Sequence, residues 1–279
     1  MRLLTYVLIL ILGGTLVSPT KIKSETNTSP SISTYVKIKR SGVIKIGVAQ
    51  NYPPLRHTIA NKKVGLEVEM AKALGRFFEV KVKFIEVSSK QYISAVVSGE
   101  VDIIIAGVSR SLTRAKKVWF STPYLNFSPA VLVDKRIMPK TSFGDEFEEV
   151  PFKTLWDLRK LSNFIFAVKK DSVYEEIINE NFDNKKIKLV KNNAQGLELL
   201  NNGEVNGFVQ DSILLNYWYN HKRGLKKRYK LLKGGRLNES LSVVLPFNSF
   251  VLKNQIDLFI LELVRKKKIA NWLKKYTNR

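Results

Sequence analysis

Hydrophobic and polar residues follow two alternating rhythms along the chain. The run 43–48 is short and β-branched, residues 65–78 carry apolar side chains at helical spacing, and 80–87 alternates as a strand does. A helix over 92–97 and a fully buried strand over 101–106 repeat this order. Strands separated by helices of this length predict βαβ units and a parallel sheet that is covered on both faces.

The rhythm stops in a turn-rich, charged stretch over 134–151 and then restarts. The second half is expected to contain strands at 164–168, 187–190 and 205–209 and helices at 172–181, 195–201 and 211–220, followed by a returning strand at 241–245 and helices over 249–276. We therefore expect two α/β lobes, with 41–130 and 244–279 in lobe 1 and 131–243 in lobe 2. Two such sheets that face one another place a ligand cleft between them, at the carboxyl ends of their strands.

The first forty residues lie outside this pattern. A positive start, the apolar run 3–12 and the small residues after it are typical of a secretory signal. The alternative is a membrane anchor, but the run is shorter than the roughly 20 apolar residues that a spanning helix requires. We expect a signal peptide over 1–20 and a linker over 21–40, in which residues 24–33 are rich in Ser, Thr, Asn and Pro, with the folded part beginning near Ser41.

The composition excludes or disfavours several kinds of metal site and catalytic site. The 279 residues contain no cysteine, which excludes disulfides, thiolate metal sites, cysteine nucleophiles and a lipid-modified cysteine after the signal. Only two histidines are present, which disfavours a histidine metal site or a serine–histidine hydrolase. We expect no cofactor and no metal, and a periplasmic or secreted location.

The formal net charge is +23, and basic runs occur at 226–228 and 265–268. Such runs could bind nucleic acid or an anionic surface. They sit between apolar periodic positions, without a nucleic-acid motif or interleaved stacking aromatics. We interpret them as a solvated face that is attracted to anionic envelope polymers, and we expect no nucleic-acid partner.

Two loops that follow buried strands carry opposite charges. The hydroxyl-rich loop from Gly107 through Ser109 ends at Arg114, whose planar fork matches a carboxylate. Asp211 follows the strand 205–209 in the second half. Arg114 could instead begin a solvated helix, and Asp211 could be a helix N-cap. Taken together, a cation in one lobe and an anion in the other describe a site for a zwitterion.

Two further positions could line this site. Asp171 and Ser172 open a helix after a strand, where backbone amides bind anions, and Lys169 adds positive charge; ordinary capping is the alternative. Tyr52 follows the first strand and precedes two prolines that stiffen the loop and would present its ring as an apolar wall. A surface turn is the competing interpretation.

Signals for catalysis are weak. No paired carboxylates at fixed spacing, nucleophile beside a base or glycine-rich phosphate loop stands out in the sequence. Glu67 and Glu69 lie two apart on a predicted helix and therefore point in different directions. The sequence favours binding over catalysis.

These loops, in this order, resemble the family of extracellular solute-binding proteins that serve polar amino-acid ABC transporters. The resemblance runs from about Ser41 to the C-terminus and rests on SGVIKIGV at 41–48, YPP at 52–54, GLEVEM at 65–70, SGEVD at 98–102, FSTPY at 120–124, TLWDL at 154–158 and NGEVNG at 202–207. Each motif is weak alone, but together they are specific. The resemblance implies a two-lobed periplasmic-binding-protein-like fold (type II), with two crossing hinge strands near 127–133 and 242–245.

The resemblance also implies residue roles. Arg114 would hold the α-carboxylate of an amino acid, assisted by Ser109 and by the helix start at Ser172, while Asp211 would hold the α-amino group and Tyr52 would line the side-chain pocket. Ligand binding would favour a closed form that a membrane ABC permease recognises, and the family expectation is a monomer.

The chain departs from the family pattern at three positions. Ser89 stands where the family usually has a stacking aromatic, Asp171 replaces a glycine, and Arg110 replaces an apolar residue. The extra positive charge of Arg110 and Lys169 favours an acidic or otherwise anionic ligand. Two alternatives on the same fold stay open, which are an enzyme of the cyclohexadienyl (prephenate/arogenate) dehydratase type and a basic surface protein used for adhesion or sensing.

Overall fold

The computed structural model describes residues 33–138, 140–143, 146–149, 152–183, 185–235, 239–247 and 249–277. The predicted signal peptide over 1–20 and most of the predicted linker over 21–40 lie outside these ranges. None of the helices within them is long and apolar enough to cross a membrane.

The fold begins earlier than the sequence pattern indicates. Helix α1 (Thr34–Ser41) starts seven residues before the expected position, after Ser33, whose side chain accepts the backbone N–H of Val36 at 3.4 Å. Ile38 is fully buried and is the anchor of an otherwise polar helix. Gly42 ends the helix with φ +65°, a conformation that glycine adopts readily. A single buried residue leaves little helical periodicity to detect in the sequence.

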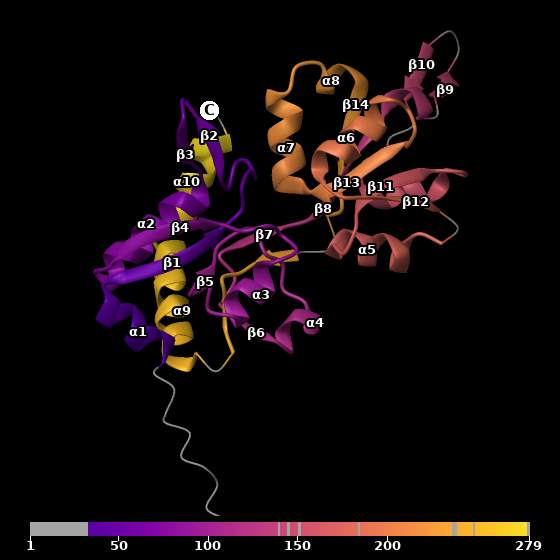
Figure 1. The fold of residues 1–279 in the computed structure, drawn as a ribbon. Helices are drawn as coiled ribbons and strands as arrows, with labels where there is room; N and C mark the ends of the chain where they lie inside the picture. The colour runs from indigo at the N-terminus through magenta and orange to yellow at the C-terminus, as the bar shows by residue number, and fades with distance from the viewer. Residues whose placement is uncertain are drawn as a thin grey trace, which may run out of the picture. The chain divides into compact units, whose positions relative to one another are not determined.

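Lobe 1 is built on a five-stranded sheet (Figure 1). In sheet order its strands are β4 (Lys81–Glu86), β1 (Val43–Val48), β5 (Ile103–Ile104), β16 (Val244–Pro246) and β6 (Val118–Phe120). Strand β5 is shorter than the expected 101–106, although every residue of that run is buried.

Lobe 2 is built on a second five-stranded sheet. In sheet order its strands are β12 (Lys186–Val190), β11 (Ile165–Lys169), β13 (Gly207–Asp211), β8 (Pro129–Asp134) and β14 (Tyr229–Lys233). All six residues of β8 are buried, so this sheet begins at Pro129.

Both sheets are mixed, which corrects the expectation of a parallel sheet. Strand β16 runs antiparallel to β5 and β6, and β8 runs antiparallel to β13 and β14, whereas the other described neighbours, β1 with β4 and β5, and β11 with β12 and β13, are parallel. The antiparallel strand in each sheet is the one that enters after the chain has crossed from the other lobe.

The two crossings pair with each other. Strand β7 (Leu125–Phe127) and strand β15 (Glu239–Leu241) form a two-stranded antiparallel sheet of their own. The crossing strands that the resemblance implies are therefore present, but they pair a few residues before the expected 127–133 and 242–245. The reason is that β8 and β16, which cover most of those ranges, are already hydrogen-bonded within the lobe sheets.

Helices surround both sheets. The remaining helices associated with lobe 1 are α2 (Leu66–Phe78), α3 (Tyr92–Val97), α4 (Leu112–Ala115), α9 (Phe250–Arg265) and α10 (Lys268–Thr277), and those of lobe 2 are α5 (Val173–Asn181), α6 (Asn193–Asn201), α7 (Ser212–His221) and α8 (Leu225–Arg228), with 3₁₀ turns η1 (Lys135–Ile137) and η2 (Leu155–Lys160). Helices α9 and α10 pack against α2, so the C-terminal helices lie on the same side of the molecule as the first helices of lobe 1. Buried apolar side chains fill the space between sheet and helices, such as Ile46 with Ile256 in lobe 1 and Phe208 with Leu215 in lobe 2.

Two hairpins complete the fold. One joins β2 (His57–Ile59) to β3 (Lys62–Val64), and the other joins β9 (Lys140–Phe143) to β10 (Glu146–Glu149). The second hairpin lies inside the stretch 134–151 that the sequence pattern marks only as turn-rich.

Candidate ligand-binding site

A buried carboxylate in lobe 2 is bonded to lobe 1. Asp211 ends β13 and caps α7, and its Oδ1 accepts the backbone N–H of Leu214 at 2.6 Å. Its Oδ2 accepts the hydroxyl of Tyr52 at 2.5 Å, and Tyr52 follows β1 in lobe 1. Asp211 is only 1% exposed, and this burial raises its pKa, while the bonds from Tyr52 and Leu214 oppose the rise. Asp211 is therefore both the N-cap that the sequence allows and an interlobe acceptor.

Tyr52 is fitted against the loop that begins at Gly107. A Cβ atom on Gly107 would lie 2.2 Å from Cε1 of Tyr52, and Gly107 has φ +62°, so only glycine is accommodated here without strain. Tyr52 is half-buried, and its ring lies against this loop. Burial raises the pKa of the Tyr52 hydroxyl well above its usual range, and the charge of Asp211 raises it further, so the hydroxyl remains a donor.

Glu67 holds this loop in place through a hydrogen bond to its backbone, a role that the sequence pattern does not reveal. Its Oε1 accepts the backbone N–H of Gly107 at 2.7 Å and the hydroxyl of Tyr124 at 2.5 Å. Its Oε2 is buried and has no hydrogen-bond partner among the described residues. Burial raises the pKa of Glu67 to about 7, against the opposing effect of these two bonds. A signal exists in the sequence, because Glu67 shares the buried stripe of α2 with Ala71 and Leu74.

The arginine of the same loop presents a cation without an acidic partner. Ser111 caps α4 by accepting the backbone N–H of Arg114 at 3.3 Å, and Nη1 of Arg114 donates to the carbonyl of Ser109 at 2.9 Å. Arg114 is half-buried, and no carboxylate of the described chain lies within ion-pair distance of its guanidinium. The loop therefore holds the guanidinium by one neutral bond and leaves its remaining donors for another acceptor.

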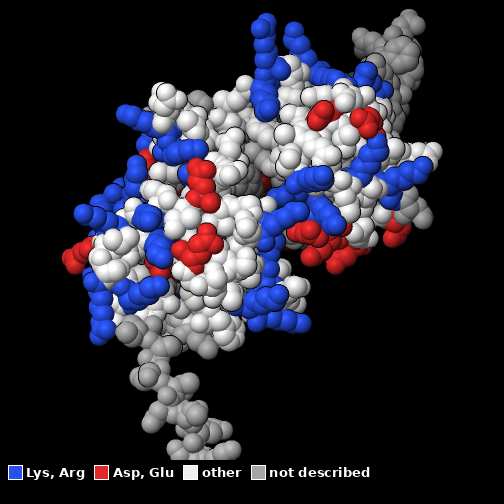
Figure 2. All heavy atoms as spheres, in the orientation of Figure 1, with Lys and Arg blue, Asp and Glu red and all other residues white. Residues whose placement is uncertain are grey.

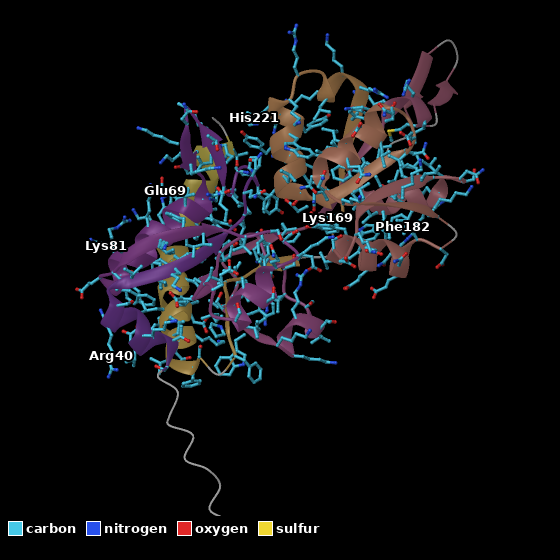
Figure 3. All side chains as sticks on the ribbon, in the orientation of Figure 1. Arg40, Glu69, Lys81, Lys169, Phe182 and His221 are labelled. Atoms are coloured by element: carbon cyan, nitrogen blue, oxygen red, sulfur yellow. The ribbon has the colours of Figure 1, made fainter. Side chains whose placement is uncertain are left out.

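A lysine of lobe 2 lies near this guanidinium. Lys169 lies at the end of β11 (Figure 3). Its Nζ donates to Oγ of Ser89 in lobe 1 at 3.0 Å. Burial lowers the pKa of Lys169, and the positive charges of Arg114 and Lys90 lower it further. Ser89, which stands where the family usually has an aromatic, thus takes part in an interlobe hydrogen bond beside a cluster of cations.

The start of α5 lies next to Lys169 but is not capped by its serine. The hydroxyl of Ser172 donates to the carbonyl of Lys169 at 2.5 Å, and no side chain caps the helix from that position. Asp171 has φ +59°, a left-handed conformation that favours glycine, and its N–H donates to Glu175 at 2.8 Å. The first amides of α5 therefore remain available to an anion.

The structure brings the candidates together as two groups. Asp211, Tyr52 and Gly107 form an acidic group, and Arg114, Ser109, Lys169 and Ser172 form a basic group. Each group contains residues from both lobes, and the loop from Gly107 to Arg114 contributes to both. Arg110 is exposed and belongs to neither. The described residues contain no cluster of three or more His, Asp or Glu side chains that could hold a metal ion.

The family follows from a comparison of the sequence with known families. The model of the bacterial extracellular solute-binding proteins, family 3, matches residues 44–279. The chain belongs to this family. Its members include substrate-binding proteins of amino-acid ABC transporters, and the sequence-based assignment of family and fold is confirmed.

Individual relatives are distant. The ABC transporter arginine-binding protein 1 of Escherichia coli (strain K12) is 24% identical over 176 residues, which cover 63% of this chain and 65% of that protein. The cyclohexadienyl dehydratase of Pseudomonas aeruginosa (strain ATCC 15692) is 28% identical over 90 residues, which cover 32% of this chain and 34% of the enzyme. This chain thus spans less than two thirds of the length of either relative, and the family includes both binding proteins and an enzyme.

A solved structure has the same architecture. The ancestral amino acid-binding protein AncCDT-1, a precursor of cyclohexadienyl dehydratase, superposes with a TM-score of 0.72 and 23% identity over 88% of this chain and 100% of that chain. The likeness extends to both lobes and establishes the fold.

Proposed function

We propose that the protein captures an amino acid or a similar small zwitterion between its lobes and delivers it to a membrane ABC transporter. The proposal is supported by a buried lobe 2 carboxylate, Asp211, bonded to Tyr52 beside the loop that begins at Gly107, and by the guanidinium of Arg114 on that same loop, which has no acidic partner among the described residues. A zwitterion supplies the two missing charges, an ammonium for Asp211 and a carboxylate for Arg114.

Lobe closure follows from this division of the charges. Lobe 1 supplies the cation for the ligand's carboxylate, and lobe 2 supplies the anion for its ammonium. The ligand therefore gains its full set of charge-assisted hydrogen bonds, worth roughly 1.5–3 kcal/mol each, only when both lobes contact it. Tyr52 already occupies Oδ2 of Asp211, so a bound ammonium would compete with or join its hydroxyl. We propose Ser109, Gly107, Ser172 and Lys169 as further contacts.

Domain boundaries and export belong to the same proposal. We propose that lobe 1 comprises 41–130 and 244–279, preceded by helix α1, and that lobe 2 comprises 131–243. A signal peptide over 1–20 would direct the protein to the periplasm or outside the cell. The membership of strands in the two sheets supports this division, except that Pro129 and Ala130 belong to β8 of the lobe 2 sheet. Amino-terminal sequencing of the exported protein tests the signal peptide.

Binding is favoured over catalysis by the position of Glu67. It is the buried acid with a pKa of about 7 and so the residue best suited to proton transfer at neutral pH. It is 0% exposed, and its one bonded oxygen is occupied by Gly107 and Tyr124. A substrate in the cleft would not reach it, and we propose that the protein performs no chemistry on its ligand.

The test is a thermal-shift and calorimetry screen over the common amino acids, including aspartate, glutamate and arginine. The cluster of Lys169, Lys90 and Arg114 supports the prediction of an acidic ligand. For whichever amino acid binds, Arg114→Ala should weaken the affinity about 10- to 100-fold, which corresponds to one charge-assisted contact. Arg110→Ala is the matched control, because this exposed arginine lies in the same loop and outside the site.

A second pair of variants examines the acidic group. Asp211→Ala should abolish measurable binding and also lower stability, because it removes the α7 cap. Asn192→Ala removes the cap of α6 in the same lobe and should lower stability alone. A well-folded protein that no amino acid stabilises, or turnover of prephenate or arogenate, would contradict the proposal.

A further inference from the structure

The outer face of α9 carries large apolar side chains that are exposed in the described part of the chain. Four large side chains recur there at helical spacing, and their exposed fractions are Phe250 63%, Val251 48%, Leu258 61% and Leu261 56%. The opposite face of the helix is buried in lobe 1. Polar side chains such as Asn254 lie between these residues, but a group of large apolar side chains exposed on one helix face is typical of an interaction surface.

Aromatic rings extend the surface beyond the start of the helix. Phe247 is 52% exposed, and its ring lies 5.9 Å from that of Trp119, whose ring is 6.5 Å from that of Phe250. Trp and Phe together with Leu are the side chains that enter the boundary between lipid headgroups and acyl chains.

Positive charge adjoins this apolar face. Arg265, Lys266, Lys267 and Lys268 follow one another where α9 meets α10. The acids of α9 are already paired, Asp257 with Lys253 at 2.5 Å and Glu262 with Arg265 and Lys266 at 2.8 and 2.7 Å.

Lys267 and Lys268 have no carboxylate within ion-pair distance in the described part of the chain. Lys and Arg also predominate over Asp and Glu across the face shown in Figure 2.

We propose that the outer face of α9, from Phe247 to Lys268, docks the protein onto an anionic lipid bilayer. The exposed apolar side chains would enter the interface, and the basic turn would contact the lipid headgroups. Each cation near an anionic membrane surface is attracted to it within about a Debye length. The surface is separate from the ligand site, so its action does not depend on the proposed amino-acid binding.

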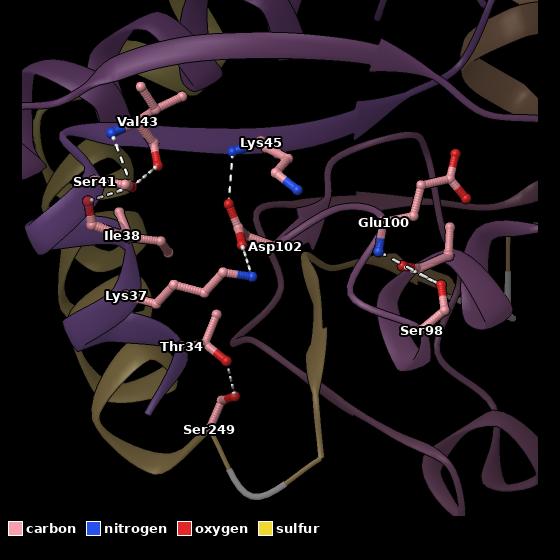
Figure 4. A network of polar contacts seen from close by, with 11 residues as sticks. Thr34, Lys37, Ile38, Ser41, Val43, Lys45, Ser98, Glu100, Asp102 and Ser249 are labelled. Carbon is pink, nitrogen blue, oxygen red and sulfur yellow. Dashed lines mark hydrogen bonds and ion pairs between the residues drawn. The ribbon is translucent and has the colours of Figure 1, made fainter. Parts of the chain in front are cut away.

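Charge distinguishes the bilayer from the other candidate occupants. A second copy of the chain docked through the same face would bring two basic turns together. At the start of α9, the hydroxyl of Ser249 donates to that of Thr34 at 3.3 Å (Figure 4). The sequence over 1–32 carries Arg2, Lys21 and Lys23 against a single acid, Glu25, so this segment adds positive charge too. An anionic bilayer supplies both an apolar layer and the opposite charge.

The experiment uses the absence of cysteine from the chain. A single Leu258→Cys substitution in the full chain, labelled with an environment-sensitive fluorophore, is mixed with vesicles of phosphatidylcholine alone or of phosphatidylcholine and phosphatidylglycerol in equal parts. We expect a blue shift and an intensity gain only with the anionic vesicles, weakened by high salt. Leu189→Cys, an exposed position in lobe 2 with 45% exposure, is the matched control and should show no change.

Sedimentation with the same vesicles gives an independent readout. Leu258→Gln combined with Leu261→Gln should reduce the bound fraction at least tenfold, whereas Leu189→Gln should not. Circular dichroism and the ligand affinity of each variant confirm that the fold and the ligand site are intact. Vesicle binding without a signal from Leu258, undiminished binding of the double variant, absence of binding by the parent chain, or a Leu258 signal that requires only a second copy of the protein would overturn the proposal.

Discussion

Two buried carboxylates, one in each lobe, accept the same two kinds of donor. Glu67 in lobe 1 and Asp211 in lobe 2 each accept one backbone N–H, and each also accepts a tyrosine hydroxyl at 2.5 Å. The difference lies in the tyrosine. Tyr124 belongs to the same lobe as Glu67, whereas Tyr52 reaches Asp211 from the other lobe.

Because of this difference, the Glu67–Tyr124 bond is structural, whereas the Tyr52–Asp211 bond can be replaced by a bond to a ligand. The Glu67–Tyr124 bond persists whatever the lobes do, because both residues move with lobe 1. The Tyr52–Asp211 bond has to break when the lobes separate, and a ligand ammonium can substitute for it. The same chemistry therefore holds a loop in place in one lobe and forms a replaceable contact between the lobes in the other.

The largest expected effect concerns the pH dependence of stability. Glu67 titrates at about 7 in the folded protein against 4.5 when unperturbed, so the folded state binds this proton more tightly. Its contribution to stability is present below about 4.5, falls as the pH rises toward 7 and is then lost, a change of about 3 kcal/mol. Denaturant unfolding at pH 5 and pH 8 measures it.

Glu67→Gln is the control for this prediction. Glutamine keeps the carbonyl acceptor for Gly107 and Tyr124 but does not titrate, so the free energy of unfolding of the variant should vary less with pH by about that amount. If the free energy of unfolding depends on pH equally in the parent and the variant, the pKa of Glu67 does not differ between the folded and unfolded states as described.

The next effect compares the two tyrosines directly. Tyr124→Phe should lower the free energy of unfolding by about 2 kcal/mol, because it leaves the fully buried Glu67 with one donor fewer. Tyr52→Phe should cost less, about 1 kcal/mol, because its bond to Asp211 joins the two lobes and is lost whenever they separate. Thermal or denaturant unfolding of both variants gives the values.

Ligand affinity sharpens this comparison. Tyr52→Phe should change the affinity for the bound amino acid, because the competing donor on Asp211 is gone, while Tyr124→Phe should leave it unchanged. Equal effects of the two substitutions on affinity would show that both tyrosines act only through stability.

The smallest effect concerns the helix starts of lobe 2. Ser172 does not cap α5, because its hydroxyl bonds the carbonyl of Lys169, so Ser172→Ala should change stability by less than about 0.5 kcal/mol. A loss near the roughly 1 kcal/mol that is typical of a removed N-cap would show that the serine caps the helix in solution. Chemical unfolding of the variant distinguishes the two.

The sequence predicts the lobes well because strands and helices alternate with clear periodicity, and it places Asp211 and Arg114 after buried strands. It does not predict the Tyr52–Asp211 or Lys169–Ser89 bonds, since these depend on the distance between lobes rather than on local pattern. Glu67 was missed because its partners, Gly107 and Tyr124, come from distant parts of the chain. Helix α1 was missed because one buried residue gives no periodicity.

The interleaving of the sheets has a consequence for how the molecule can be divided. Strand β6 joins the lobe 1 sheet through β16, which is made more than a hundred residues later in the chain. A fragment that ends at the first crossing would lack β16. Strand β6 would then have no partner in the sheet, and one edge of β5 would have unpaired backbone N–H and C=O groups. Cutting the chain at a crossing does not release two independent halves, so limited proteolysis there should leave fragments that stay associated and lose their structure together.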